Sequence, residues 1–193
     1  MKKSVCLPAA AAVLLAALAL PAAGRPVAAG EVVPDFEVVN RASGRPMRLG
    51  DFAGRIIVLD FFAYWCGPCL AASADLERGI GRYYAERAGN PAGLPVVVIA
   101  INVEPGHPER TADFVRRAGL ELTADDVRHE AFARFDEKNA LPLVVVINGL
   151  ADLPSRKPWE LLYRKVGYEG AAAVRAVIDP LAAVRTPPGG AGR

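Results

Sequence analysis

The stretch IIVLDFFAYWCGPCL, residues 56–70, joins an apolar run to a pair of cysteines. Its first seven residues, Ile56 to Phe62, are almost continuously apolar, which is typical of a strand buried on both faces of a sheet. Trp65-Cys66-Gly67-Pro68-Cys69 follows, and apolar residues then recur at helical spacing. The stretch therefore predicts a central strand, a turn that carries the cysteines, and a helix that begins at them.

The spacing of Cys66 and Cys69 is that of a redox-active pair. The first N–H groups of a helix have no partner within the helix, and the helix dipole favours negative charge there, so a thiolate at Cys66 is stabilised. Cys69 lies one turn further on, within reach of a mixed disulfide at Cys66. Pro68 falls in the first turn, where a missing N–H costs little. The pattern indicates thiol-disulfide exchange.

A structural disulfide and half of a metal site are the alternatives. A structural zinc site takes four ligands, usually two cysteine pairs or one pair with histidines. This chain offers one pair, and His107 and His129 lack ligand spacing with each other. A disulfide that closes so short a loop constrains the unfolded chain little. Redox chemistry is favoured, and we expect neither a resident metal nor an organic cofactor.

The chain has 193 residues and a formal charge of +2, and this length suits one domain with its own core. Three positive residues, Lys2, Lys3 and Arg25, precede the first acidic residue, Glu31; from Glu31 onward there are 20 basic and 21 acidic residues. This balance implies no basic face, and we expect no nucleic-acid partner.

Residues 1–30 have the pattern of a signal peptide or N-terminal anchor. Lys2 and Lys3 precede Ala9 to Leu20, an apolar run that fits a signal peptide and is short for a membrane span. Small residues at 22–24 and 28–30 offer two cleavage contexts; without cleavage, the segment would anchor the protein to the inner membrane. In both cases we expect a periplasmic or other extracytoplasmic location. Cleavage would leave Cys66 and Cys69 as the only cysteines.

Strands and helices alternate along the rest of the chain. Besides the central strand, we expect extended pieces at 31–40 and 47–54, strands at 96–101, 143–147 and 161–166, and a short edge strand at 120–122. Helices are expected at 67–87, at 108–118, from Asp125 or Asp126 onward with Val127, Ala131 and Phe135 facing inward, and at 169–181. This alternation predicts one α/β domain over residues 31–185, with helices on both faces of one sheet, and a flexible tail at 186–193.

Further short motifs accompany the cysteine pair: Pro34-Asp35-Phe36, the run LGDFAGR at 49–55, Leu141-Pro142 and Gly167. Together with Trp65 to Cys69, they make residues 33–184 resemble the thioredoxin superfamily, and within it the exported TlpA/ResA-like thiol-disulfide oxidoreductases. The resemblance implies a thioredoxin fold: a central mixed sheet with helices on both faces and an N-terminal extended or hairpin extension.

The resemblance also implies roles for residues around the pair. Cys66 would attack a client disulfide, and Cys69 would resolve the mixed disulfide. Pro142 would be a cis proline facing the pair, leaving the backbone of Leu141 free to pair with an extended client segment. Trp65, Gly67 and Pro68 would contact the client as well.

Asp60 lies six residues before Cys66, where thioredoxin has a buried acid. A carboxyl group in so apolar a strand would be desolvated and its pKa raised, so that it could exchange a proton with Cys69. The alternative is that Asp60 ends the strand in water. Ala72 and Ala74 stand where many relatives have Glu and Pro, so no acid is expected from that side and more weight falls on Asp60. The long connection at 148–158 is expected to be a surface insertion.

These observations predict an exported enzyme that reduces protein disulfides. Its partners would be cysteine-containing client proteins and a membrane thiol-electron donor. A metal-binding protein that holds copper or zinc on the reduced pair, and a redox-inert interaction domain, are the rival interpretations.

Overall fold

The computed structural model describes residues 25–136 and 138–183. The expected signal or anchor lies outside the described residues except for 25–30, and the expected tail at 186–193 lies outside them altogether. Within the described part, no helix has both the length and the apolar composition that a bilayer span requires. The expected domain can therefore be compared with the structure over almost all of its length.

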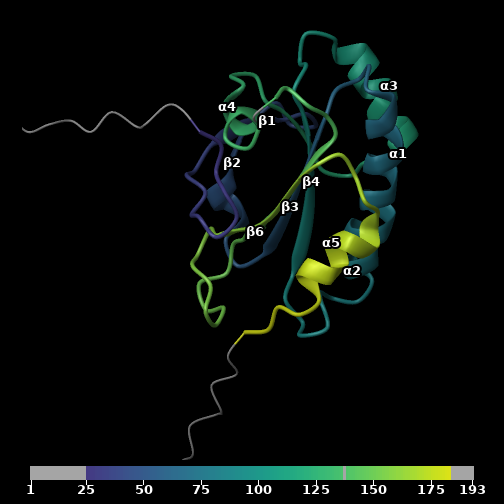
Figure 1. The fold of residues 1–193 in the computed structure, drawn as a ribbon. Helices are drawn as coiled ribbons and strands as arrows, with labels where there is room; N and C mark the ends of the chain where they lie inside the picture. The colour runs from purple at the N-terminus through teal and green to yellow at the C-terminus, as the bar shows by residue number, and fades with distance from the viewer. Residues whose placement is uncertain (1–24, 137, 184–193) are drawn as a thin grey trace, which may run out of the picture.

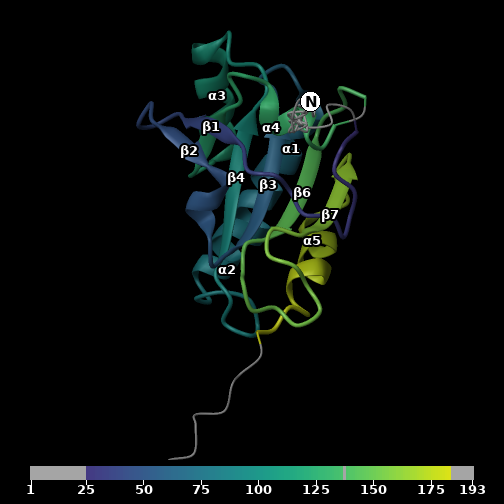
Figure 2. The same cartoon turned by 90° about the vertical axis from the view of Figure 1, so that its left-hand side faces the viewer.

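One mixed sheet of seven strands forms the centre of the described domain, in the order β2-β1-β5-β4-β3-β6-β7 (Figures 1 and 2). β3 runs parallel to β4 and antiparallel to β6, while β1 and β2 form an antiparallel hairpin at one edge. The predicted mixed sheet and hairpin extension are confirmed. The strands are β1 (Glu37–Asn40), β2 (Pro46–Arg48), β3 (Ile56–Phe62), β4 (Val96–Asn102), β5 (Thr123–Asp125), β6 (Leu143–Asn148) and β7 (Leu161–Val166).

β3 lies inside the sheet between β4 and β6, and all seven of its residues are buried. Alternate side chains point to opposite faces of the sheet. Ile56 and Val58 pack in a cluster with Leu76 and Ile80 of the active-site helix, whereas Phe61 packs on the opposite face against Phe132 and Phe135. The continuous apolar run thus results from burial on both faces.

The helices cover the two faces unequally. On one face lie α1 (Gly67–Leu76), the π-helical turn η2 (Glu77–Arg82), α2 (Tyr83–Ala85), α3 (Pro108–Ala118) and α5 (Ala171–Ile178) (Figure 1). The other face carries α4 (Glu130–Ala133) and the N-terminal segment that leads into β1 (Figure 2). The short 3₁₀ helix η1 (Leu49–Phe52) precedes β3.

Residues 25–33 follow the domain surface closely. The amide of Val27 donates to the carbonyl of Arg134 at 2.8 Å, and that of Gly30 donates to the carbonyl of Leu161 at 2.9 Å. Val32 forms an isolated antiparallel bridge with Glu160. Residues before the expected boundary at 31 therefore also contact the domain.

The edge strand expected at 120–122 was placed too early. Gly119 ends α3 in the left-handed conformation, with φ at 67°, and the amide of Leu120 then returns to the carbonyl of Val115. This helix C-cap occupies the first residues after the helix, so the strand begins at Thr123, next to Leu122, whose carbonyl accepts the amide of Ala100 of β4 at 3.0 Å. β5 is also not an edge strand, because the β1–β2 hairpin extends the sheet beyond it.

The helix expected from Asp125 or Asp126 is much shorter than predicted. The buried Asp126 carboxylate accepts the amides of Ala131 and Phe132, and His129 is in the left-handed conformation, with φ at 56°. A helix cannot run through that residue, so α4 begins at Glu130. Val127 is consequently 53 % exposed rather than buried, while Ala131 and Phe135 face inward as expected.

Two helices differ from the prediction at their ends or in their middle. The last helix occupies Ala171–Ile178 rather than 169–181; Gly170 precedes it with φ at 93°, and Pro180 follows it. The active-site helix extends from Gly67 to Ala85 but widens to a π turn at Glu77–Arg82. That turn brings Gly79 against α5, where a Cβ atom would lie 2.4 Å from the Cβ of Ala171.

We predict that Gly79→Ala destabilises the domain by about 1–2 kcal/mol, because overpacking outweighs the gain in helix propensity. Urea unfolding would measure the change. Adding Ala171→Gly should restore part of the loss, whereas Gly106→Ala, where a Cβ meets nothing within 4 Å, should have little effect. Equal stability of Gly79→Ala and the parent would contradict this close packing.

Candidate active site

Cys66 and Cys69 form a disulfide at the N-terminus of α1, with their Cα atoms 5.3 Å apart. Cys66 is the N-cap residue of the helix, and its Sγ accepts the amide of Cys69 at 3.2 Å. Pro68 occupies the first turn, as expected. A thiolate at Cys66 would receive that amide and the positive end of the helix dipole, which is the arrangement that stabilises such an anion.

The two cysteines of the pair are both buried, but not to the same extent. In the disulfide form, Cys66 is 6 % exposed and Cys69 is fully buried. Cys66 is therefore the more accessible of the two, but it is not an openly exposed residue. Gly67 and Pro68 are exposed beside it.

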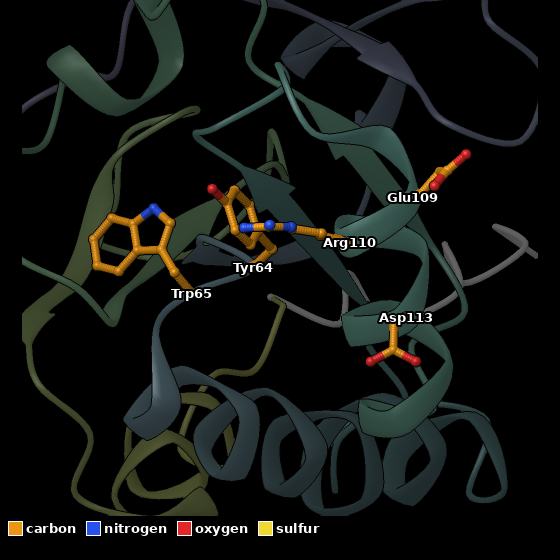
Figure 3. A pocket seen from close by; sticks show the side chains of 5 residues that line it. All are labelled: Tyr64, Trp65, Glu109, Arg110 and Asp113. Atoms are coloured by element: carbon orange, nitrogen blue, oxygen red, sulfur yellow. The ribbon is translucent and has the colours of Figure 1, made fainter.

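Trp65 projects from the turn before the cysteines and is 60 % exposed. Together with Tyr64 it lines an open groove of about 520 Å³, whose other wall is the first turns of α3 with Glu109, Arg110 and Asp113 (Figure 3). The Arg110 guanidinium lies 5.5 Å from the centre of the Tyr64 ring, and Figure 3 shows it reaching toward that ring. The turn after β3 thus presents an aromatic surface directly beside Cys66.

Leu141 and Pro142 lie at the same end of the sheet as the cysteines. Leu143, the first residue of β6, pairs with Phe61 near the end of β3. In this antiparallel register, Pro142 lies beside the C-terminal end of β3. The Leu141–Pro142 peptide bond is cis. Pro142 is buried and its carbonyl accepts the amide of Gly167, whereas Leu141 is partly exposed.

Asp60 lies inside the domain, with none of its side chain exposed. The alternative that it ends the strand in water is therefore wrong. Neither carboxyl oxygen has a hydrogen-bond partner among the described residues. Burial raises the pKa of Asp60 to about 7; the nearby Ser73 hydroxyl opposes this rise, and the Glu77 carboxylate adds to it. A carboxyl group with such a pKa has the protonation equilibrium that proton transfer near neutral pH requires.

Sequence reasoning missed the polar residues that face Asp60 from the helix. Ser73 and Glu77 follow Cys69 at intervals of four residues, and both are buried, at 0 % and 4 % exposed. Burial also raises the pKa of Glu77. The expectation that no acid acts on Asp60 from the helix is therefore wrong, because the Glu77 carboxylate is close enough to raise the pKa of Asp60.

No group of three or more His, Cys, Asp and Glu side chains within the described ranges could hold a metal ion. His107 instead packs against the Tyr64 ring, with the ring centres 4.8 Å apart. His129 takes part in the turn before α4.

Comparison with known proteins agrees with this geometry. The chain is 44 % identical over 95 residues to the thiol-disulfide oxidoreductase ResA of Geobacillus thermodenitrificans (strain NG80-2), which covers 49 % of this chain and 48 % of that protein. The ResA of Geobacillus kaustophilus (strain HTA426) is 36 % identical with the same coverage. The chain thus matches about half the length of these curated relatives.

Solved structures show the same fold. A secreted thiol-disulfide isomerase from Corynebacterium glutamicum superposes with a TM-score of 0.62 at 21 % identity, covering 77 % of this chain and 83 % of that one. A DsbF homologue from Corynebacterium diphtheriae gives 0.60 at 22 % identity, covering 84 % and 96 %. At these identities the likeness establishes the thioredoxin-like fold.

The family assignment rests on a longer match. The model of the AhpC/TSA family matches residues 29–149, which include β1 to β6, the cysteine pair and the Leu141–Pro142 bond. This match spans more than half of the sequence, and the fold and the ResA relatives agree with the resemblance inferred from the motifs. The chain belongs to the AhpC/TSA family.

Proposed function

We propose that the protein is an extracytoplasmic thiol-disulfide oxidoreductase that reduces disulfides in client proteins. The observation that carries this proposal is the Cys66–Cys69 disulfide at the start of α1, with one sulfur accepting a helix amide and an open groove beside it. The ResA relatives, which are named thiol-disulfide oxidoreductases, support it.

The reaction exchanges two electrons between two cysteine pairs. The Cys66 thiolate attacks a client disulfide, forms a mixed disulfide and releases one client thiolate. Cys69 then loses its proton and attacks the Cys66 sulfur, which forms the Cys66–Cys69 disulfide and releases the second client thiolate. The client is reduced and the protein is oxidised, so a membrane thiol-electron donor must reduce the pair again.

The surface around Cys66 suggests how a client is held. The exposed ring of Trp65 and the exposed Gly67 and Pro68 lie where a client chain approaches the sulfur. Leu141, just before β6, has backbone groups that an extended client segment can pair with, and the buried Pro142 lies next to it. Cysteines that must stay reduced, such as those that receive haem or copper, are clients suggested by the family resemblance alone.

The N-terminal contacts bear on processing. Cleavage after residue 30 would remove the hydrogen bonds that Val27 and Gly30 make to the domain. Cleavage near Ala22 to Gly24 would keep them. We therefore favour the earlier of the two cleavage contexts for a released, extracytoplasmic form; an uncleaved anchor would also keep them.

The division of labour between the cysteines can be tested by trapping. We predict that the Cys69→Ser protein, once reduced and mixed with insulin, accumulates a mixed disulfide, because the attack by Cys66 proceeds but resolution does not. Non-reducing electrophoresis and mass spectrometry would detect the adduct. The Cys66→Ser protein should form little or none. Failure of the parent protein to reduce insulin would favour the redox-inert alternative, and bound copper or zinc in the reduced protein would favour the metal-binding one.

The working direction can be tested by redox equilibration. Gly67 and Pro68 place no histidine or charged group between the cysteines, so we predict a potential near that of thioredoxin, about −270 mV, rather than that of DsbA, about −120 mV. Equilibration with glutathione buffers, followed by Trp65 fluorescence or thiol alkylation, would give the value. A potential above about −180 mV would make the protein an oxidant or isomerase instead.

The role of Asp60 can be tested by kinetics. Cys69 must lose a proton before it attacks, and only the ionised form of Asp60 can take it, so the resolving rate should rise as the pH rises through about 7. We predict that Asp60→Asn slows resolution about 100-fold, the scale of a lost general base, and removes this pH dependence while the first attack changes little. Rapid-mixing measurements of single turnovers across pH separate the two steps. An unchanged resolving step would exclude the role.

A further inference from the structure

A row of buried polar residues runs along the inner side of the active-site helix. Cys69, Ser73 and Glu77 are spaced by four residues, so they lie on neighbouring turns of one helix face. All three are buried, and Asp60 of β3 faces them. Isolated polar groups in such a position cost free energy, so their alignment between the reactive pair and the far half of the helix calls for a function.

Ser73 in this row, and Asp60 opposite it, have donor and acceptor positions that are not used in regular hydrogen bonds. No described residue meets the full geometry of a hydrogen bond with either carboxyl oxygen of Asp60 or with the Ser73 hydroxyl, but the Ser73 hydroxyl lies close enough to Asp60 to lower its pKa. A hydroxyl can donate one proton and accept another, which lets it pass a proton between two carboxyl groups. Ser73 lies one helical turn from Cys69 and one from Glu77, so it occupies the step between them.

The far end of the row approaches solvent. The Glu77 carboxylate accepts the amide of Glu121 at 3.4 Å. At the surface next to it, Arg82 and Glu121 form an ion pair whose side chains are 48 % and 68 % exposed. Gly81 leaves room for the carboxylate: a Cβ there would lie 2.9 Å from its Oε1 atom. Glu77 therefore connects the interior with the surface between η2 and the end of α3.

One further titratable group interacts with Asp60, and its hydroxyl is already hydrogen-bonded elsewhere. The Tyr168 hydroxyl, which lies close enough to sense the charge of Asp60, donates to Asp75 at 2.7 Å. The Arg175 guanidinium acts on Tyr168; it donates to the carbonyl of Gly79 at 2.9 Å and lies over the Tyr83 ring. Among the described groups that act on Asp60, Glu77 is thus the one carboxylate that also reaches toward the surface.

We propose that Ser73 and Glu77 form a proton path between Asp60 and solvent, which opens at the Arg82–Glu121 pair. The proposal rests on the function proposed above, in which Asp60 takes the Cys69 proton. During the mixed disulfide, the client covers the Cys66 side of the domain. Glu77 lies 11 residues along the helix from Cys66, about 16 Å away, so its exit stays open. A proton on Asp60 then passes through the Ser73 hydroxyl to Glu77 and on to water, and no bond other than O–H bonds changes.

The path matters because many molecules begin the resolving step with Asp60 protonated, and a protonated Asp60 cannot act as the base for Cys69. With its pKa near 7, a large share of molecules at neutral pH carry a protonated Asp60 that cannot accept the Cys69 proton. These molecules must first lose that proton beneath the bound client. A path that exchanges it quickly lets all molecules resolve at one rate, whereas a blocked path divides them into a fast and a slow population.

The test is a single-turnover reaction of the reduced full chain with excess insulin, followed by Trp65 fluorescence and acid-quenched thiol alkylation between pH 6 and 8. We expect one resolving phase in the parent and two in Glu77→Gln. The slow phase should be about tenfold slower, and its amplitude should fall as the pH rises, because fewer molecules then carry protonated Asp60. The exposed Glu86→Gln provides the matched control and should behave as the parent does.

Two further variants separate a path from a merely structural role. Gly81→Ala keeps the Glu77 carboxyl group but displaces it, so it should also produce a slow phase, and it serves as the second test if Glu77→Gln does not fold. Glu77→Gln in the Asp60→Asn background should add nothing to the defect of Asp60→Asn alone.

The outcomes distinguish this proposal from the one it rests on. A single phase with the parent's pH dependence in both Glu77→Gln and Gly81→Ala overturns the proton path, and leaves Asp60 as a base that exchanges through the client side. Loss of mixed-disulfide formation in the parent overturns the proposed function itself. A slow phase whose amplitude does not change with pH overturns the path too, because it indicates a structural defect.

Discussion

The structure depends on the complete burial of β3. Its seven residues lie between β4, which is parallel to β3, and β6, which is antiparallel to it, and side chains cover both of its faces. The chain can therefore leave the sheet only after the last residue of β3. The chain leaves there through the turn at residues 63–65, and the helix that covers the face begins at once. This places Cys66 at a helix N-terminus, at the same edge as Leu141 and Pro142. The reactive geometry is thus a consequence of where β3 ends.

The same burial lowers the stability of the domain when the Asp60 carboxyl group is ionised. The folded pKa of about 7 lies above the ordinary value of 3.8, so folding favours the protonated form. The stability that this form provides is fully present below about pH 4 and is lost as the pH rises through about 7. Above that, the ionised carboxylate costs about 4 kcal/mol, a large part of the 5–15 kcal/mol that typically stabilises a domain. An apolar residue would avoid this cost, which is consistent with a carboxyl group kept for proton transfer.

The sequence was most informative where burial and covalent chemistry coincide. The apolar run, the cysteine spacing and the Pro68 position lead to the strand, the pair and the helix start, because each has a strong local signal. It was least informative between residues 119 and 135, where single side chains decide the path. The Asp126 carboxylate caps α4 from four residues before Glu130, and His129 adopts a left-handed conformation that only tertiary contacts impose. Periodicity alone predicts a longer helix there, since Val127, Ala131 and Phe135 have helical spacing.

The π turn at Glu77–Arg82 shows why only part of the candidate site could be predicted from the sequence. In an α-helix, residues four apart drift by about 40° around the axis, so a row at positions 69, 73 and 77 turns away from any one neighbour. A π turn contains more than four residues and changes this phase within the helix. Glu77, the first residue of the turn, is buried, and Ile80 and Tyr84 further along pack into the core. Gly79 and Gly81, which weaken a regular helix, are the residues that this turn uses, one to approach α5 and the other to make room for the Glu77 carboxylate. Two residues that disfavour a regular helix are thus accommodated by the contacts of this turn.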